Sequence, residues 1–574
     1  MTDERDERPE RLERLGRRHY LGVLGAAAAS LAGCPGSTED DTATPAPPTE
    51  LDSRVATPTS APDPARHGIE FDRVLGAVDD LGLDPSGERA VDGALQQALT
   101  RPGTLVVFPA GRYRVTETVT LGVERVGILG QGDVRLVPDA GFDGLLIDGP
   151  IGSIDDVLVE NVDIDIRADD TTTGIRLLCR NHFHVQDVEY LGRGTDDSPG
   201  GTTSAFLLAV RNAEGHGVLR NAVAKKGSRV DGYADGNGRI GVWVGWSNKG
   251  TVRIEGCDFR EFGNNGAYSS RTPGRVEIVD CYFLNNNVSG ARIGGEGSYV
   301  ENCTVEIDLE KYTGPIADEP TEFNTRGLVV EQGLETSGPP LPAGAEIRDC
   351  RVVARQSPQI QAVIEQSPQA RSLLVRDTEV VCDVDETPAI RRGTPGEVAY
   401  RPDRQRPPMP YWTRLRNVTV RGRAAGSAAV DLRSAPASSV VNCDIACPGA
   451  DRDGVMVSRS PRSEVVDSEV ATTGHPVVVV VDPATASDRH LLCLGAGTTL
   501  DHTDGAGKAA ALTADPPLLQ TLSHDSETDT VCLGPGPNLS AVVPPLHIAI
   551  NALDDGVPLG RLLRDRPVSR LDAR

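Results

Sequence analysis

Lysine, aromatic residues and long apolar stretches are all scarce in this sequence of 574 residues. Only five of its 58 basic residues are lysine and the formal net charge is -25, so no basic surface offsets the negative field and we expect no nucleic-acid partner. Aromatic residues make up 4%, while glycine (62) and proline (41) are plentiful, which argues against a helical bundle and predicts frequent turns. One apolar run lies near the N-terminus, and no other stretch is long and apolar enough to be considered as a membrane span.

The N-terminus has the features of an export signal. Arg17 and Arg18 precede a run of twelve apolar or small residues, 21–32, which is too short for a permanent membrane span. The paired arginines resemble a twin-arginine signal, and Leu-Ala-Gly-Cys ending at Cys34 resembles a lipobox whose cysteine takes a lipid. The acidic, Lys-poor composition is similar to that of halophilic proteins. Together these features predict an exported lipoprotein of haloarchaeal type, anchored only through Cys34 at the outer face of the cell membrane. The alternative is an N-terminal helix with a buried cysteine.

Composition divides the chain into four regions. Residues 1–34 form the signal segment, and 35–66, rich in Pro, Thr and Asp, predict a disordered linker. Residues 67–485 carry a repeat. Residues 486–574 lack it, and we expect them to form a small cap over the open edge of the last coil, with a short helix near 546–553. Cys493 and Cys532 in this region form either a disulfide or two buried thiols.

One motif recurs along 67–485. An apolar residue and any residue precede an Asn, Asp or Gly, here called the anchor residue, and a small or apolar residue follows it. The shorter spacings between anchors are 22–26 residues and the longest is 47, which indicates a fixed unit that carries loop insertions. The anchors are Asn161, Asp187, Asn221, Gly256, Asp280, Asn302, Asp349, Asp377, Asn417, Asn442 and Asp467.

A second strand recurs between anchors and usually opens with glycine, as in GVWVGW from residue 241 and GARIGG from residue 290. Strands of about five residues cannot bury their inner faces alone, whereas stacked coils pair successive strands in parallel at about 4.8 Å. Gly and Asn turns would close each coil. The pattern predicts an all-β fold, a right-handed parallel β-helix of about 11–13 coils.

Five anchors are followed by cysteine, at 257, 281, 303, 350 and 443, where other coils have valine, alanine or threonine. This interchange predicts a stack of buried thiols rather than metal ligands or disulfides. Asn264, Asn265 and Asn285–Asn287 are expected to form asparagine ladders in tight turns.

The stretch VDDLGLDPSGERAVDGALQQALTRPGTLVVFPAGRYRVTETVTL, residues 78–121, resembles the opening of pectate-lyase-like β-helix proteins. In that family an Asp-rich turn leads to a short capping helix, which corresponds to Asp92–Leu99 here. A strand that ends in Phe-Pro-x-Gly-x-Tyr opens the first coil, and Gly103–Tyr113 matches it. The resemblance implies the fold more than any chemistry.

Alternation in the second strands predicts which side chains face solvent. If the residue after the opening glycine points inward, the next points outward, and outward residues of adjacent coils stack into a ladder. Aromatic faces cover sugar rings and Arg pairs with carboxylates or sulfates, so Arg176, Trp243 and Tyr268 are candidate polysaccharide-binding residues. Ordinary cross-strand packing beneath a loop is the alternative. The expected outward residues are Arg176, Trp243, Tyr268, Arg292, Val329, Val363 and Met456.

Loop insertions at 192–204, 225–239, 310–326 and 391–412 are expected to wall a groove over the coils from about 174 to 331. β-Elimination from a uronate would need a base, for which Arg292 or Arg176 is the candidate by resemblance to pectate lyases. It would also need a cation such as Ca²⁺. The candidate oxygen ligands for that cation are Asp196, Asp197, Asp231 and Asp235.

Hydrolysis would instead need paired carboxylates. Asp196-Asp197, His216 between two glycines, and Arg292-Ile293 resemble three polygalacturonase signatures in the right order. Gly294 stands where that family has lysine, and no Asn-Thr-Asp lies upstream. His182 and His216 each precede an anchor by five residues, so we expect them on adjacent coils, as turn histidines or as a metal pair.

The sequence therefore predicts a monomeric cell-surface protein that binds polysaccharide, with lyase or hydrolase action on uronate-containing glycans as a hypothesis and Ca²⁺ as the one cofactor considered. The alternative from another class is a non-catalytic surface adhesin or structural β-helix protein.

Overall fold

The computed structural model describes residues 63–152, 154–195, 204–231, 233, 238–270, 272–316, 323, 325–332, 344–396, 406–481, 492–495 and 498–502, and the backbone of three further strands up to residue 550. All of them belong to the second of two compact units, Pro47–Arg574. The predictions for residues 1–62, which include Cys34, lie outside the described residues. In the described part of the chain no helix is long and apolar enough to cross a membrane.

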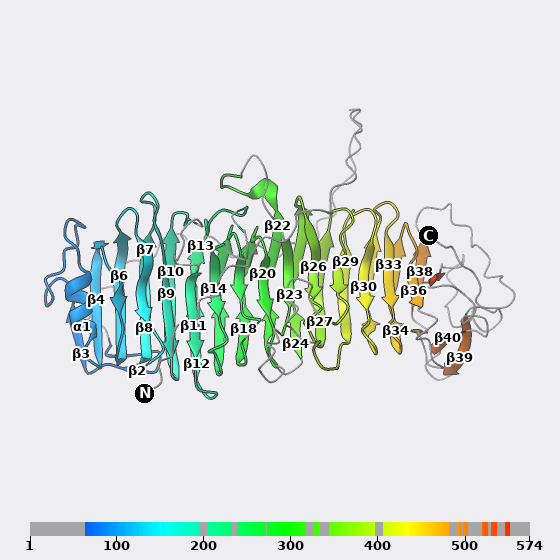
Figure 1. Ribbon diagram of the computed structural model, residues 1–574, viewed down its shortest axis with the longest axis horizontal. Helices are drawn as coiled ribbons and strands as arrows, with labels where there is room; N and C mark the ends of the chain where they lie inside the picture. Colours follow the sequence, from blue (N-terminus) through cyan, green and yellow to red (C-terminus); the bar gives the residue numbers. More distant parts are fainter. Residues whose placement is uncertain are drawn as a thin grey trace, which may run out of the picture. The chain divides into compact units, whose positions relative to one another are not determined.

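The chain of this unit winds as a right-handed parallel β-helix, as the repeat predicts, and Figure 1 shows its strands stacked in sequence order from blue to orange. A typical coil gives two short strands to a bent sheet and one strand to a 14-stranded sheet. Thirteen of these 14 strands run parallel, which agrees with the predicted number of coils.

Each sheet is continuous along the coils. The strands of the 14-stranded sheet are β5 (Val119–Thr120), β7 (Asp143–Gly149), β9 (Thr172–Cys179), β11 (Ser204–Val210), β14 (Ile240–Val244), β17 (Asn265–Tyr268), β20 (Ser289–Ile293), β23 (Thr325–Val330), β26 (Ile360–Gln366), β28 (Ile390–Arg392), β30 (Ala428–Arg433), β33 (Asp453–Ser458), β36 (Val477–Val481) and β41 (Leu546–Ile550). Those of the bent sheet are β3 (Arg73–Gly76), β4 (Thr104–Val115), β6 (Glu124–Pro138), β8 (Asp155–Asp165), β10 (His182–Leu191), β12 (His216–Arg220), β13 (Val223–Ala224), β15 (Thr251–Glu255), β16 (Asp258–Arg260), β18 (Arg275–Val279), β19 (Tyr282–Leu284), β21 (Tyr299–Glu301), β22 (Thr304–Asp308), β24 (Ala345–Arg348), β25 (Arg351–Gln356), β27 (Leu373–Cys382), β29 (Thr413–Arg421), β31 (Ser439–Val441), β32 (Asp444–Cys447), β34 (Ser463–Val466), β35 (Glu469–Thr472), β37 (Leu492–Leu494), β38 (Thr499–His502), β39 (Leu519–Asp525) and β40 (Thr530–Pro535).

The helix predicted near the start of the repeat is present as α1 (Asp92–Leu99). It packs against β4 and β5, and its Leu95 and Leu99 are part of the same buried core that runs through the coils. Thr116 donates its backbone N–H to Asp92 at 2.8 Å, which ties the helix to the turn after β4. The remaining short elements are a hairpin, β1 (Ala65–Arg66) with β2 (Ile69–Glu70), and the 3-10 helix η1 (Leu309–Lys311).

Every anchor residue lies at a corner of the bent sheet with a positive φ, between 49° and 63°. This left-handed region is open to glycine and tolerated by asparagine and aspartate, which explains the composition of the anchors. Anchor side chains also bond from coil to coil: Asn302 donates its amide to Asp280 at 2.6 Å, and Asn442 donates to Asn417 at 2.6 Å. The asparagine ladders of this fold therefore include the corners as well as the turns.

The residue after each anchor points into the core, and the predicted stack of buried thiols is confirmed. The backbone N–H of Cys257 donates to Sγ of Cys281 (3.4 Å), and that of Cys281 donates to Sγ of Cys303 (3.3 Å). All three are free and buried, and burial raises the pKa of Cys257 and Cys303. In a later coil Ser468 Oγ replaces sulfur and accepts from Cys443 N at 3.1 Å. Where this position holds cysteine, serine or threonine, its side chain thus links neighbouring coils.

The turn asparagines are buried and bond to neighbouring coils. Asn286 Oδ1 accepts the backbone N–H of Phe262 at 3.1 Å, and Asn285 Oδ1 accepts that of Asp308 at 2.7 Å. The side-chain amide oxygens thus accept backbone N–H groups that have no backbone partner in the turn.

The end of the repeat differs from the sequence prediction in two respects. The prediction of a helix near 546–553 is wrong, because residues 546–550 form β41, which pairs antiparallel with β36. Parallel pairing also continues beyond residue 485, since β37 and β38 pair with β34 and β35. Cys493 is disulfide-bonded, and Cys532 lies opposite it in the antiparallel register of β37 and β40. Antiparallel strands thus cover the last parallel edge of both sheets.

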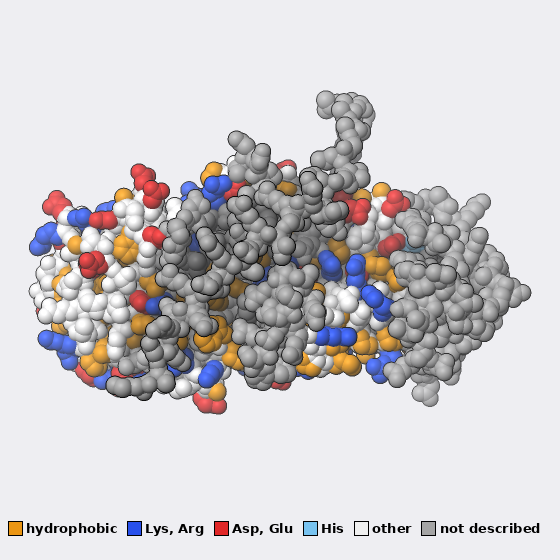
Figure 2. Space-filling model, in the orientation of Figure 1, with side chains coloured by type: hydrophobic (Ala, Val, Ile, Leu, Met, Phe, Trp, Pro, Cys, Tyr) orange, Lys and Arg blue, Asp and Glu red, His pale blue; other side chains and the backbone are white. Residues whose placement is uncertain are grey.

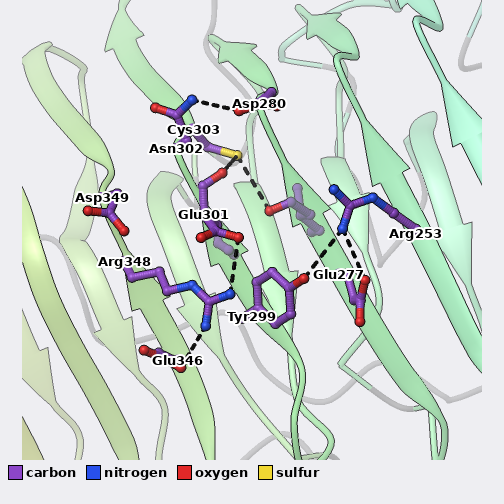
Figure 3. A network of polar contacts seen from close by, with 12 residues as sticks. Arg253, Glu277, Asp280, Tyr299, Glu301, Asn302, Cys303, Glu346, Arg348 and Asp349 are labelled. Atoms are coloured by element: carbon purple, nitrogen blue, oxygen red, sulfur yellow. Dashed lines mark hydrogen bonds and ion pairs between the residues drawn. The ribbon is translucent and has the colours of Figure 1, made fainter.

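The outward face of the bent sheet carries a network of charge pairs (Figure 3). Arg253 donates to Glu277 at 3.1 Å, and to the hydroxyl of Tyr299 at 3.4 Å. Arg348 lies 4.0 Å over the Tyr299 ring and donates to Glu301 at 3.0 Å, which lowers the pKa of that carboxyl. Figure 2 shows basic and acidic side chains interspersed on the described part of one face. Most charges here therefore have a partner in the sheet itself.

Replacing an anchor tests the left-handed corner. Asp280→Val should lower the free energy of unfolding by about 1–2 kcal/mol, because a β-branched residue is strained at a φ of 54°. Asp280→Gly loses the hydrogen bond from Asn302 but keeps the left-handed backbone conformation. Its free energy of unfolding should therefore stay close to that of the wild type. Urea denaturation measures the free energy of unfolding of both variants. An equal loss of stability in the two variants would contradict the strain explanation.

The pair of Arg348 with Glu301 predicts a pH-dependent contribution. Because the folded pKa of Glu301 is lowered, its stabilisation is fully present above the unfolded value of about 4.3 and is lost as pH falls through the folded value. The wild type should therefore have a higher thermal midpoint than Glu301→Gln at pH 7, and the difference between the two midpoints should shrink below pH ~4. Thermal midpoints of both proteins across this range measure it, and a difference that grows on acidification would be inconsistent with the pair.

Candidate functional site

The outward residues predicted for the second strands share one register on the 14-stranded sheet. Arg176 on β9 lies opposite Leu207 on β11, which lies opposite Trp243 on β14. Tyr268 on β17 and Arg292 on β20 follow on the next two coils. We call these five residues the strip. Val329 and Met456 also lie in this register, further along the sheet.

The strip faces outward because its sequence neighbours face the core. Val242 and Val244 on either side of Trp243 are buried in the core, as are Ala291 and Ile293 on either side of Arg292. Alternation along a strand then directs the residue between them to the opposite face of the sheet. Trp243, Tyr268 and Arg292 are accordingly only half-buried.

Aromatic and cationic groups stack along the centre of the strip. The rings of Trp243 and Tyr268 are stacked, with centroids 6.4 Å apart and an interplanar angle of 15°. The Arg292 guanidinium lies 5.3 Å from the centre of the Tyr268 ring. Two flat rings followed by a guanidinium form a platform on which sugar rings can stack and an acidic substituent can be bound.

Arg292 is held in place by an acidic residue that the sequence reasoning missed. Its Nη1 forms an ion pair of 3.0 Å with Glu331, and Ser270 Oγ donates to the same carboxylate oxygen at 3.2 Å. The Glu331 side chain is only 6% exposed. Glu331 follows the Gly-led strand 327–330 by one residue, and the alternation that predicts Val329 outward also predicts Glu331 outward.

A second buried carboxylate lies beside the first. Glu365 on β26 is opposite Val329 and pairs with Arg326 of β23. Glu365, and not the predicted Val363, occupies the outward register, since Val363 is buried in the core. The prediction for Val363 is wrong because Val363 aligns with Gly327, the glycine that opens the neighbouring coil's motif, and the outward position comes two residues later in both strands.

The first end of the strip is also ion-paired. Arg176 makes two hydrogen bonds to the Asp148 carboxylate of β7, at 2.7 and 2.8 Å. Leu207 separates Arg176 from Trp243, because β11 is a complete strand without an opening glycine. A search for Gly-led strands could not find it, although its alternation of apolar residues resembles the others.

The predicted catalytic residues are not assembled into one group by the described part of the structure. Asp196, Asp197 and Asp235 lie outside the described residues. Asp231 is buried and accepts two hydrogen bonds of 3.0 Å from Arg229. His216 begins β12 on the bent sheet, opposite His182 as expected, whereas Arg292 is on the other sheet.

The sequence gives these acidic and histidine residues as candidate metal ligands. Among the residues that the structure describes, no three His, Cys, Asp or Glu side chains are grouped as a metal site would require.

Three of the predicted loop insertions meet at the amino-terminal side of the strip. They line a cavity of about 550 Å³ whose wall includes Arg193, Lys225, Lys226 and the segment 313–315. Arg193 forms an ion pair with buried Glu261 and lies 5.4 Å from the centre of the Tyr312 ring. Insertions distant in sequence thus wall one cavity over neighbouring coils, as expected for this part of the chain.

The fold and the strip define a parallel β-helix protein with an outward platform of aromatic and arginine side chains. No protein-family model and no curated protein matches the sequence. Solved structures are similar in fold. The A-module of the mannuronan C-5 epimerase AlgE4 from Azotobacter vinelandii is 11% identical, with a TM-score of 0.41 over 71% of this chain and 97% of that one.

Two further solved structures are similar to this chain. A tailspike protein variant of E. coli bacteriophage HK620 is 11% identical, with a TM-score of 0.44 over 81% of this chain and 91% of the tailspike. PfbA, a surface adhesin of Streptococcus pneumoniae, is 10% identical, with a TM-score of 0.41 over 73% of this chain and 96% of the adhesin. At such identities the likeness concerns the fold alone.

The ion pair of Arg292 with Glu331 can be measured by a double-mutant cycle. Arg292→Met should destabilise the protein more than Arg292→Met combined with Glu331→Gln, because the single change leaves a buried carboxylate without its guanidinium. We expect a coupling free energy of about 1–3 kcal/mol from denaturation of the four proteins. Additive effects of the two substitutions would show that the pair does not determine the position of Arg292.

Proposed function

We propose that this protein binds an acidic, uronate-containing polysaccharide along the strip. The observation that carries the proposal is the stacking of Trp243, Tyr268 and Arg292 on three consecutive coils. Adjacent coils are about 4.8 Å apart, so the platform presents repeating contacts along the direction in which the coils stack. A polymer with repeating rings and acidic groups fits such a surface better than a single small molecule does.

The charges of the strip favour an acidic ligand in spite of the net charge of -25. Arg292 and Arg176 each keep part of the side chain exposed, 13% and 32%, while their carboxylate partners are more deeply buried. The partner carboxylates therefore orient the guanidinium groups, and the guanidinium groups remain the groups that a ligand can reach.

The proposal includes a location at the cell surface. Its support is the sequence of the first 34 residues, in which a paired arginine precedes an apolar run that ends at Cys34. A polymer-binding protein anchored by one lipid through the Pro-, Thr- and Asp-rich segment 35–66 could reach glycan outside the cell. In this form the protein acts as a surface adhesin.

Cleavage of the bound polymer is the second candidate function. It is favoured by two buried carboxylates, Glu331 and Glu365, on consecutive coils next to the strip. Paired carboxylates are the groups that glycoside hydrolysis needs, and Arg292 beside Glu331 is the base candidate for β-elimination. Both schemes place the reaction at the carboxyl-terminal end of the same platform.

Substitution of the central tryptophan tests the binding function. Trp243→Ala should weaken binding of galacturonate oligomers by about tenfold, which corresponds to ~1.4 kcal/mol of lost ring contact. Calorimetric titration in high salt, with and without Ca²⁺, gives the affinities. Trp412→Ala is the matched control, because Trp412 is also half-buried but precedes β29 on the bent sheet, where it contacts Arg414.

The same samples separate the two candidate functions. Ultraviolet absorbance of unsaturated ends would reveal β-elimination and a reducing-sugar assay would reveal hydrolysis, and either should disappear in Glu331→Gln. Binding without product would leave the adhesive function. Equal affinities of Trp243→Ala, Trp412→Ala and the wild type would contradict binding along the strip.

A further inference from the structure

The loops that follow the strands of the 14-stranded sheet enclose a second cavity, of about 370 Å³. It has an aromatic and cationic wall that the sequence motifs do not indicate. Its lining includes Ile151, Arg180, Arg211, Asn212, Trp246 and Lys249. Three cations and no carboxylate line it, in a chain whose net charge is -25.

The apolar part of this cavity is unusually open to solvent. Trp246 is 69% exposed and Ile151 is 53% exposed, and both are among the few large hydrophobic side chains that the described part of the chain exposes. A single exposed apolar residue needs no explanation, but two that line one cavity with cations suggest a binding surface. An exposed indole face can cover a sugar ring, and cations beside it can bind an acidic substituent.

The cavity is built on rigid backbone. The parallel hydrogen-bond ladder continues from the strands into these loops: Arg211 N donates to Cys179 O at 3.0 Å, and Lys249 N donates to Val210 O at 2.7 Å. The buried side chain of Asn248 adds a bond of 2.9 Å from Val210 N. The cationic side chains therefore project from fixed positions, which lowers the entropy cost of binding.

Two of the three cations are available to a ligand. Arg180 pairs with Glu124 at 2.7 Å. Arg211 and Lys249 form no ion pair with any carboxylate that the structure describes, although most arginines of the bent sheet do. Lys249 is one of only five lysines in the sequence. Unpaired cations on an acidic protein give this cavity a local charge opposite to that of the whole chain.

The cavity continues the strip along the strands. Arg176 and Arg180 lie on one coil, and Trp243 and Trp246 lie on another, so the two sets are three or four residues apart in the chain, which is at most about 10–13 Å. A Cβ at Gly245 would lie 3.4 Å from Nε1 of Trp243, so the indole of Trp243 extends towards the loop that carries Trp246. One polymer could therefore contact both surfaces.

We propose that this cavity, the Trp246 pocket, binds one anionic saccharide unit of the polymer that lies on the strip. The Trp246 indole covers the sugar ring, and Arg211 with Lys249 binds the carboxylate or sulfate of that unit. The proposal rests on the proposed function of the strip and adds a separate subsite that selects acidic over neutral polymers.

Titration of the full chain with three probes tests the pocket. The probes are galacturonate oligomers, sulfated heparin-derived oligosaccharides and neutral malto-oligosaccharides. Replacing both free cations (Arg211→Gln with Lys249→Gln) should weaken binding of the anionic probe by about tenfold, reduce its salt dependence and leave neutral-probe affinity unchanged. Whichever anionic probe binds more tightly to the wild type identifies carboxylate or sulfate as the group that is bound.

A matched variant controls for the loss of charge. Arg414→Gln with Arg416→Gln removes two positive charges from exposed side chains of β29 on the bent sheet, and it should change the affinities by less than about twofold. Trp246→Ala should weaken binding of the anionic probe by about tenfold as well. Thermal midpoints within error of the wild type show that each variant is folded.

The outcomes separate the pocket from the strip. In one outcome Trp243→Ala weakens binding while Trp246→Ala and the double variant of Arg211 and Lys249 leave it unchanged. In that case the proposal for the Trp246 pocket is wrong and the proposed function of the strip stands. If the two charge variants weaken binding equally, general electrostatic attraction explains the effect and the pocket is wrong. If none of the probes binds to the wild type, both proposals are overturned.

Discussion

The left-handed corner at each anchor residue sets the register of every coil. A positive φ at one position per coil turns the chain within the bent sheet, and Asn, Asp and Gly are the residues that adopt it readily. In several coils the side chain after the corner accepts a hydrogen bond from the coil before it, as Cys281 does from Cys257. A slip of one residue would turn every inward side chain outward, so the corner and its neighbour fix which residues reach the surface.

Loop insertions leave the register of the strip intact. The spacing between Asn302 and Asp349 is 47 residues, yet Arg292 of one coil still lies opposite Val329 of the next. After the insertion the chain again forms a left-handed corner, at Asp349. This separation allows cavities to form from loops while the strip remains a continuous row on a rigid sheet.

Charge is distributed differently on the two sheets. On the bent sheet, Arg348 and Glu301 belong to a network in which cations and carboxylates bond to each other across coils. On the 14-stranded sheet, the Arg292 side chain is oriented by a buried carboxylate, lies beside the Tyr268 ring and is 13% exposed. The first arrangement satisfies its charges internally, whereas the second leaves them accessible to a ligand. This contrast is the physical basis for assigning binding to the strip.

The sequence by itself determined the anchors, the small residues that follow them, the helix at Asp92–Leu99 and the alignment of Trp243, Tyr268 and Arg292. Each of these features depends on local backbone preference or on strict alternation of side chains, and both produce a periodic pattern of residue types in the sequence.

Only the tertiary structure decided the strand Ser204–Val210, the register of Glu365, the ion pair of Arg292 with Glu331 and the pocket around Trp246. These features depend on the pairing of a strand without an opening glycine, on the alignment of Val363 with Gly327, and on contacts between residues 31 to 98 positions apart. No local preference encodes such distances, because stacking of the coils alone brings these side chains together.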